Sequence, residues 1–132
     1  LASHQFECEH WPTAQIIEQI DSRHMEVIER WGEMLRSNRY VRRSWLGEDM
    51  LSRGTWSEPI IVLAPEPDAC YPDGQPLPQP YCLLEGHHRL GYLRSMATDE
   101  LPLQPEHQVW ICRPVRDTQT FLPANPASEI NF

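Results

Sequence analysis

The stretch LLEGHHRL, residues 83–90, joins an apolar run to a glycine and then to an amphipathic segment. Its first part continues an extended run that begins at Tyr81, so we expect a strand here. Residues 88–97 repeat apolar side chains at helical spacing, which predicts a helix. The buried side of that helix would consist of Leu90, Leu93 and Met96. A strand that passes into a helix at a glycine is typical of domains in which helices pack on a sheet.

Two further strands are predicted, one upstream and one downstream of this stretch. Residues 59–64 read PIIVLA and residues 109–112 read VWIC, and both compositions favour buried strands. Residues 65–80 follow the first of them and hold six prolines. No strand ladder survives that density of proline, so we expect a loop with some polyproline II character.

Two helices are predicted nearer the N-terminus. Residues 12–38 carry an apolar stripe at three- and four-residue spacing, and Pro12 suits the first turn of a helix. The stripe consists of Ile16, Ile17, Ile20, Val27, Ile28, Trp31 and Leu35. A shorter helix is expected over residues 45–53, because Ser44 can cap its start and Gly54 can end it in a left-handed conformation. The order of elements predicts one domain of the α/β or α+β class over residues 1–132, with a C-terminal tail at 114–132.

The charge of the chain limits its partners. Its formal net charge is −8, and its basic residues are all arginine, with no lysine anywhere. Sequence-independent binding to nucleic acid depends on lysine and arginine, so the acidic balance counts against that partner. Without lysine, a Walker A phosphate loop is excluded within this chain, and any cationic contact to a phosphate must come from a guanidinium.

The sequence predicts a cytoplasmic protein with no membrane partner. No apolar run approaches the roughly 20 residues that cross a bilayer, and no signal peptide is visible at the N-terminus. The four cysteines form no Cys-x-x-Cys pair and do not have the spacing of a zinc ribbon, so reduced thiols are expected. They are Cys8, Cys70, Cys82 and Cys112.

The turn at residues 85–89 carries the residues best suited to chemistry. A helix that starts directly after a strand leaves its first amides unpaired, and these amides and the helix dipole favour an anion. Gly86 removes the side chain that would block a close approach, and Arg89 supplies a fork suited to a phosphoryl group. His87 and His88 can donate hydrogen bonds or shuttle protons. Glu85 can hold a metal ion or accept a proton from a hydroxyl.

Less specific interpretations of these residue types stay open. His87 and His88 can simply be exposed polar groups at a helix start, and adjacent residues diverge by about 100 degrees, which disfavours a shared metal ion. His4, Cys8 and His10 near the N-terminus could chelate a metal, but a fourth ligand in register is missing.

A basic cluster after the first predicted helix also has two interpretations. Arg39, Arg42 and Arg43 surround Tyr40. They can form a charged connection on the surface, or a patch that faces phosphate or nucleic acid. The acidic balance of the whole chain favours the first interpretation.

Three segments resemble the ParB/sulfiredoxin superfamily. They are EDMLSRG at 48–54, PIIV at 59–62 and the segment 84–94, in which Gly86 and Arg89 match a Gly-x-x-Arg motif. The resemblance covers about residues 45–113. It implies a small mixed-sheet α+β domain, to which a helical extension over 12–43 and a proline-rich loop at 65–80 are added.

The form of the motif is similar to the Asp-Gly-His-His-Arg version of the free serine kinases in this superfamily. The resemblance implies that Gly86, His87, His88 and Arg89 bind nucleotide phosphates, that Glu85 binds Mg²⁺ or the substrate, and that Glu85, His87 and His88 are catalytic. The kinases use a further carboxylate, for which Glu7 or Glu9 are possible counterparts; both can equally be exposed residues of a strand. His87 stands where sulfiredoxins have cysteine, and the Arg-Arg loop and helix-turn-helix of partition proteins are missing.

The function expected from the sequence is ATP- or ADP-dependent. It would be phosphotransfer to a small hydroxyl compound or hydrolysis of the nucleotide, with Mg²⁺. One alternative is a non-catalytic, nucleotide-gated binding module that meets a protein partner through the loop 65–80 and the long helix predicted over 12–38. The other is a ParB-like nuclease or DNA-associated adaptor, against which the acidic charge counts.

Overall fold

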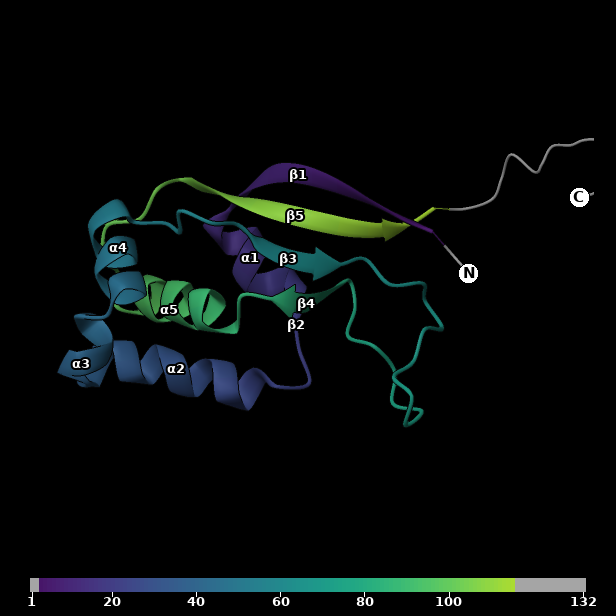
Figure 1. The fold of residues 1–132 in the computed structure, drawn as a ribbon, viewed down its shortest axis with the longest axis horizontal. Coiled ribbons are helices and arrows are strands. Elements are labelled where there is room, and N and C mark those ends of the chain that lie inside the picture. Colours follow the sequence, from purple (N-terminus) through teal and green to yellow (C-terminus); the bar gives the residue numbers. More distant parts are fainter. Residues whose placement is uncertain (1–2, 116–132) are drawn as a thin grey trace, which may run out of the picture.

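The computed structural model of the protein describes residues 3–115 (Figure 1). Its elements are β1 (His4–Pro12), α1 (Thr13–Gln19), β2 (Ile20–Asp21), α2 (Met25–Ser37), α3 (Arg39–Arg42), α4 (Trp45–Arg53), β3 (Ile60–Leu63), β4 (Tyr81–Glu85), α5 (His87–Thr98) and β5 (Glu106–Pro114). The predicted tail at 114–132 starts one residue too early, because Pro114 still pairs in β5, and residues 116–132 lie outside the described part.

The strands form one mixed sheet in the order β1-β5-β3-β4-β2. β1 pairs with β5 and β3 with β4 in antiparallel fashion, whereas β3 with β5 and β2 with β4 run parallel. The predicted α+β class with a mixed sheet is therefore confirmed.

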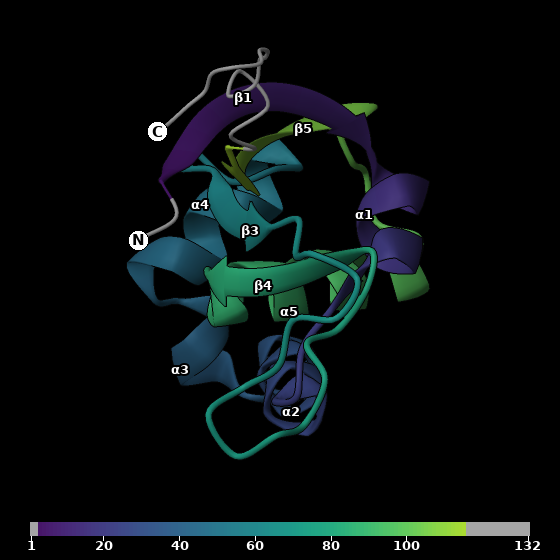
Figure 2. The same cartoon turned by 90° about the vertical axis from the view of Figure 1, so that its right-hand side faces the viewer.

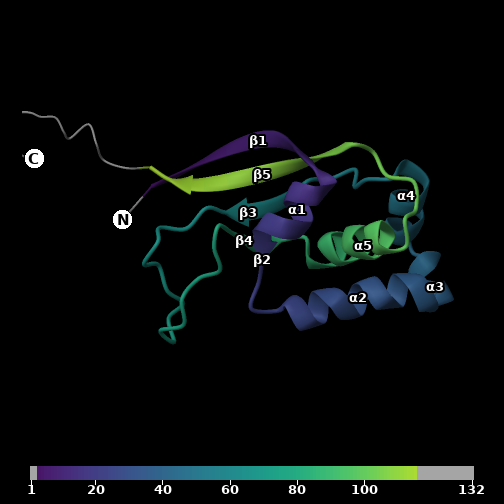
Figure 3. The ribbon, with the colours of Figure 1, turned by 180° about the vertical axis from the view of Figure 1, so that it is seen from behind.

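The helices lie against one face of this sheet. α5 lies between the sheet and α2, while α1 and α4 flank it on either side (Figures 1, 2 and 3). This central position explains why α5 is buried on more than one side, at Leu90, Gly91, Tyr92, Leu93, Ser95 and Met96.

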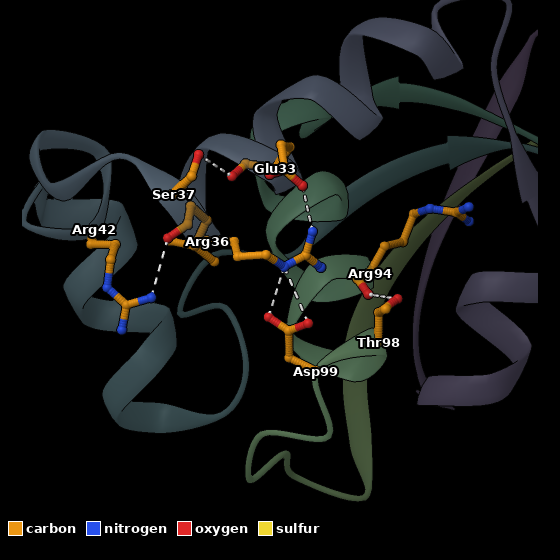
Figure 4. A network of polar contacts seen from close by, with 8 residues as sticks. Glu33, Arg36, Ser37, Arg42, Arg94, Thr98 and Asp99 are labelled. Carbon is orange, nitrogen blue, oxygen red and sulfur yellow. Dashed lines mark hydrogen bonds and ion pairs between the residues drawn. The ribbon is translucent and has the colours of Figure 1, made fainter.

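Helices α2 and α5 run parallel and approach each other closely. His24 faces His87 at their starts, and Arg36 binds Asp99 near their ends. A Cβ at Gly32 would lie 2.5 Å from the carbonyl oxygen of Gly91, so the crossing requires that small residue. As a result, both helix N-termini lie at the same end of the pair. Figure 4 shows the opposite end, where Arg36 of α2 reaches Asp99 and Glu33.

The local signals for α4, α5 and the proline-rich loop are confirmed. Helix α4 spans the predicted 45–53, with the Ser44 hydroxyl accepting the Gly47 amide at 3.1 Å and with Gly54 at φ 72°. Helix α5 extends the predicted 88–97 by one residue at each end, and its expected buried residues are all buried. Residues 65–80 contain no helix or strand, only an isolated bridge between Cys70 and Pro76.

The single helix predicted over residues 12–38 is wrong. The chain leaves helical geometry at Ile20, which pairs with Tyr81 in the short parallel ladder of β2 and β4. The Asp21 carboxylate then accepts the Ser22 amide, and the Ser22 hydroxyl accepts the His24 amide. Such side-chain bonds compete with helical ones, so the break is stabilised locally as well as by the sheet.

The N-terminal third belongs to the same core as the rest. β1 was missing from the prediction and pairs with β5 along its whole length. Trp11, Ile16, Ile20, Ile28 and Leu35 join one apolar cluster with the sheet and α5. The segment 12–43 was expected to be a helical extension. It therefore contributes the two-residue strand β2 and core side chains to the domain.

Candidate functional site

The candidate site lies where β4 ends and α5 begins. Glu85 is the last residue of β4 and pairs with Ile61 of β3, and α5 starts at His87. Gly86 between them has φ 108°, a conformation that favours glycine. A Cβ there would also lie 2.6 Å from Cγ2 of Ile60. Packing and backbone geometry thus require the glycine, whether or not a ligand approaches it.

The first amides of α5 are free to bind an acceptor. The Leu90 amide donates to the Gly86 carbonyl at 2.8 Å, which is the first bond of the helix. Within residues 3–115, the amides of His87, His88 and Arg89 have no acceptor, and Gly86 offers no side-chain cap. Unpaired amides at the positive end of a helix dipole form a favourable environment for an anion.

A pocket of about 270 Å³ opens at this corner. It is lined by Leu46, Glu85, Gly86, His87, His88 and Arg89. The structure thus brings all five residues predicted from the motif to one cavity, and α4 adds Leu46 as its apolar wall.

Arg89 points back over the glycine turn. Its Nη1 lies 3.1 Å from the place where a Cβ of Gly86 would be. Its Nη2 forms an ion pair of 3.5 Å with Glu58, whose side chain is 79 % exposed. Such an exposed, long ion pair is worth at most about 1 kcal/mol, so an incoming anion can replace Glu58 at little cost.

His88 is held against helix α2. Its ring lies over Trp31, with centroids 3.9 Å apart and planes tilted by 39°. Tyr92, one turn further along α5, has its ring 6.2 Å away. His88 is exposed overall, but partial burial of its ring lowers its pKa, and the nearby His87 and Arg89 lower it further, which favours the neutral ring.

His87 faces a different neighbour. Its ring centroid is 6.1 Å from that of His24, the residue directly before α2. The corner therefore contains the two histidines predicted from the motif and a third from another element. Within the described residues, no three side chains of histidine, cysteine, aspartate or glutamate gather closely enough to hold a metal ion.

Glu85 is an exposed carboxylate at the edge of the pocket. One carboxylate together with phosphate oxygens and water is a common way to hold Mg²⁺, so the residue fits the expected role without further protein ligands. The structure does not bring Glu7 or Glu9 to this site. Both bind Arg113, at 3.1 and 3.6 Å.

Sheet register shows how far away these two glutamates are. Cys8, Trp110, Ile61 and Glu85 form one row across four strands. Glu7 and Glu9 flank Cys8 on β1, so three strand spacings of about 4.8 Å, or roughly 14 Å, separate that strand from β4. Glu58 is the carboxylate that the structure places beside Arg89 instead.

Sequence reasoning missed the contributions of Trp31, His24, Leu46 and Glu58. Trp31 and Leu46 carried signals as apolar residues of helices, and these signals indicated only burial. The one feature of Glu58 in the sequence is its place directly before the strand predicted over 59–64. Nothing in the local pattern connected any of these residues to residues 85–89.

The basic cluster after α2 has a structural role in part. Arg42 donates to the carbonyl of Leu35 at 3.3 Å and so satisfies a free carbonyl near the end of α2 (Figure 4). The guanidinium of Arg39 lies over the ring of Tyr40, 5.2 Å from its centroid. Within residues 3–115, Arg39, Arg42 and Arg43 have no carboxylate partner.

The proline-rich loop is anchored close to the start of α2. Arg23 stacks on the ring of Tyr71 at 3.7 Å and pairs with Asp73 at 2.9 Å. The loop and residues 21–23 enclose a pocket of about 560 Å³.

In the described part of the chain, no helix is both long and apolar enough to cross a membrane.

Comparison with protein-family models, with curated proteins and with solved structures yields no match to this chain. The candidate site therefore depends on its own geometry: a glycine turn between β4 and α5, free amides, a guanidinium folded over them and a histidine stacked on a tryptophan.

Proposed function

We propose that the protein binds the phosphate groups of a nucleotide at the corner between β4 and α5. In this proposal ATP or ADP is bound with Mg²⁺, and a phosphoryl group is transferred to a small hydroxyl compound or to water. The observation that carries it is the group of unpaired amides at His87, His88 and Arg89, three residues that line one pocket. The resemblance of residues 45–113 to the ParB/sulfiredoxin superfamily supports the same proposal.

The size of the pocket favours phosphates over a whole nucleotide. Pockets for drug-sized ligands usually measure about 300–1,000 Å³. The volume of about 270 Å³ at this corner lies below that range, and most of its lining is polar or charged. The phosphate chain would occupy the pocket, and the sugar and base would extend beyond it.

Each side chain has a role that its surroundings support. Arg89 would exchange Glu58 for a phosphate oxygen and form two parallel hydrogen bonds with it. His87 and the neutral His88 would donate to phosphate oxygens or move a proton. Glu85 would hold Mg²⁺, which neutralises charge on the phosphates, or would accept the proton of the attacking hydroxyl.

Calorimetric titration of the full chain with ATP and ADP, with and without Mg²⁺, tests the proposal. Arg89→Gln should weaken binding by about tenfold or more, because it removes a charge-assisted hydrogen bond. Arg94→Gln is the matched control. Arg94 lies on the same helix, but it binds Glu29 and the carbonyl of Ile17 outside the pocket.

Comparing the affinities of Arg89→Gln and Arg94→Gln shows whether a loss of binding belongs to the proposed site. A loss at Arg89 with near-native affinity at Arg94 supports the proposed site. Equal losses in the two variants would assign the effect to net charge rather than to the corner. A wild-type chain that binds neither nucleotide at millimolar concentration would contradict the proposal altogether.

A further inference from the structure

We infer that Trp31 is a positioning residue of the phosphate site, which it serves by fixing the orientation of the ring of His88, a residue that lines the pocket. This inference depends on the proposed function, because it assigns a specific purpose to the stacked pair. It also makes α2 a part of the site, although no residue of α2 lines the pocket itself.

The geometry of the pair supports the inference. The rings of Trp31 and His88 are 3.9 Å apart between centroids, closer than the other recorded ring pairs among residues 3–115. The ring nitrogens of His88 form no recorded hydrogen bond with the described residues. Ring contacts with Trp31 and Tyr92 therefore fix its orientation, and its nitrogens stay available to a ligand.

The support beneath Trp31 is rigid. Trp31 is half-buried against the apolar core, and the neighbouring Gly32 lies directly against the backbone of Gly91. One turn of α5 separates Gly91 from His88. The close helix crossing thus sets the height of the indole relative to the start of α5, and stacking transmits that position to the imidazole.

The charge state of His88 agrees with this arrangement. Burial lowers its pKa, with smaller effects from His87 and Arg89. A neutral imidazole keeps one nitrogen as a donor and one as an acceptor, which suits a ligand with both phosphate oxygens and a proton to transfer. The other charged groups at the corner are Glu85 and, through Arg89, Glu58.

Four variants test the inference: Trp31→Leu, Trp31→Phe, His88→Gln and the double variant of Trp31→Leu with His88→Gln. NMR of the His88 ring protons reports the stacking directly, because the indole ring current shifts them. We expect Trp31→Leu to abolish that shift and Trp31→Phe to retain part of it. Trp110→Leu is the control, since Trp110 lies on β5 and is 39 % exposed.

Titration with Mg²⁺ and ADP supplies the second readout. Trp31→Leu should weaken binding by about tenfold, the loss expected for one misplaced hydrogen bond to a charged group. Trp31→Phe should restore most of that affinity. In the His88→Gln background, Trp31→Leu should add almost nothing, because the effect passes through the imidazole. Thermal unfolding of each variant establishes that it is folded at the temperature of the titration.

Two results would overturn the inference. One is an unchanged His88 proton shift in Trp31→Leu. The other is a loss of affinity from Trp31→Leu that is as large in the His88→Gln background as in the wild type. If the wild-type chain binds no nucleotide, the proposed function fails, and the inference that Trp31 serves a phosphate site fails with it. The NMR shifts would then show separately whether Trp31 orients His88.

Discussion

His107 shows how strongly a single buried polar residue can affect the stability of this domain. Its side chain is 1 % exposed, and both of its ring nitrogens have partners. Nε2 lies 2.7 Å from the hydroxyl of Thr13, and Nδ1 lies 2.6 Å from that of Thr55. The ring thereby joins the start of α1 to the segment after α4. Burial lowers the pKa of His107 to about 4, so the folded protein holds this histidine neutral.

This pKa predicts a specific loss of stability in mild acid. In the unfolded chain the histidine takes up its proton near pH 6.5, whereas the folded chain does so only near pH 4. The stabilising effect is therefore complete above about pH 6.5 and decreases as the pH falls towards 4. Between pH 7.5 and pH 5 the free energy of unfolding should fall by about 2 kcal/mol.

Urea unfolding of the wild type and of His107→Gln at the two pH values measures this effect. The variant is less stable throughout, but it lacks the titrating ring and should lose about 2 kcal/mol less on acidification. Carboxylates contribute equally to both proteins, so the difference isolates the histidine. Parallel pH profiles of the two proteins would show that His107 does not titrate as its burial predicts.

At the scale of elements, the crossing of α2 and α5 predicts a sensitivity to single methyl groups. A Cβ at Gly91 would collide with the carbonyl oxygen of Ile28, and that helix backbone cannot move without separating the pair. Gly91→Ala should reduce the free energy of unfolding by about 1–3 kcal/mol, the usual range for overpacking. This is opposite in sign to the gain that alanine brings to an unconstrained helix.

Chemical denaturation of Gly91→Ala measures this prediction, with Thr98→Ala as the control on the exposed side of α5. Thr98 donates only to the carbonyl of Arg94, so its loss should change stability by less than about 0.5 kcal/mol. The prediction would be contradicted if Gly91→Ala were as stable as the wild type. In that case the two helices would not be in close contact in solution.

Elements that were predicted from the sequence have boundaries set by neighbouring residues. Ser44 and Gly54 enclose α4, and the helical spacing of Leu90 and Leu93 identifies α5. The end of α1 at Ile20 depends instead on pairing with Tyr81, which lies far away in the chain. Periodicity could not show this break, because the apolar stripe continues through it.

The residues of the candidate site fall into the same two groups, those set by neighbouring residues and those set by contacts between distant segments. Residues 85–89 are contiguous, so the motif and the elements around it identified them together. Trp31, Leu46 and Glu58 reach the corner only because α2, α4 and β3 pack around it. Their roles follow from tertiary contacts, for which one sequence without relatives offers no signal.

At the scale of the whole molecule, we expect the domain to need its N-terminal third in order to fold. The superfamily resemblance predicted from the sequence is confined to residues 45–113, but the apolar core also contains Trp11, Ile16, Ile20, Ile28 and Leu35. Without β1 and α2, strand β5 keeps only β3 as a neighbour in the sheet, and one side of α5 is exposed to water. A fragment of about 70 residues already has a marginal core, so this additional loss should prevent cooperative folding.

Expression of residues 45–115 alongside residues 1–115 tests this expectation. The longer chain should show a cooperative thermal transition and dispersed amide resonances, whereas the shorter one should show neither. Since Trp31 is absent from the fragment, even a folded fragment would lack the contact that orients His88. A dispersed spectrum from residues 45–115 would mean that the N-terminal segment is an addition to a complete domain, and α2 would then be dispensable for the fold though not for the site.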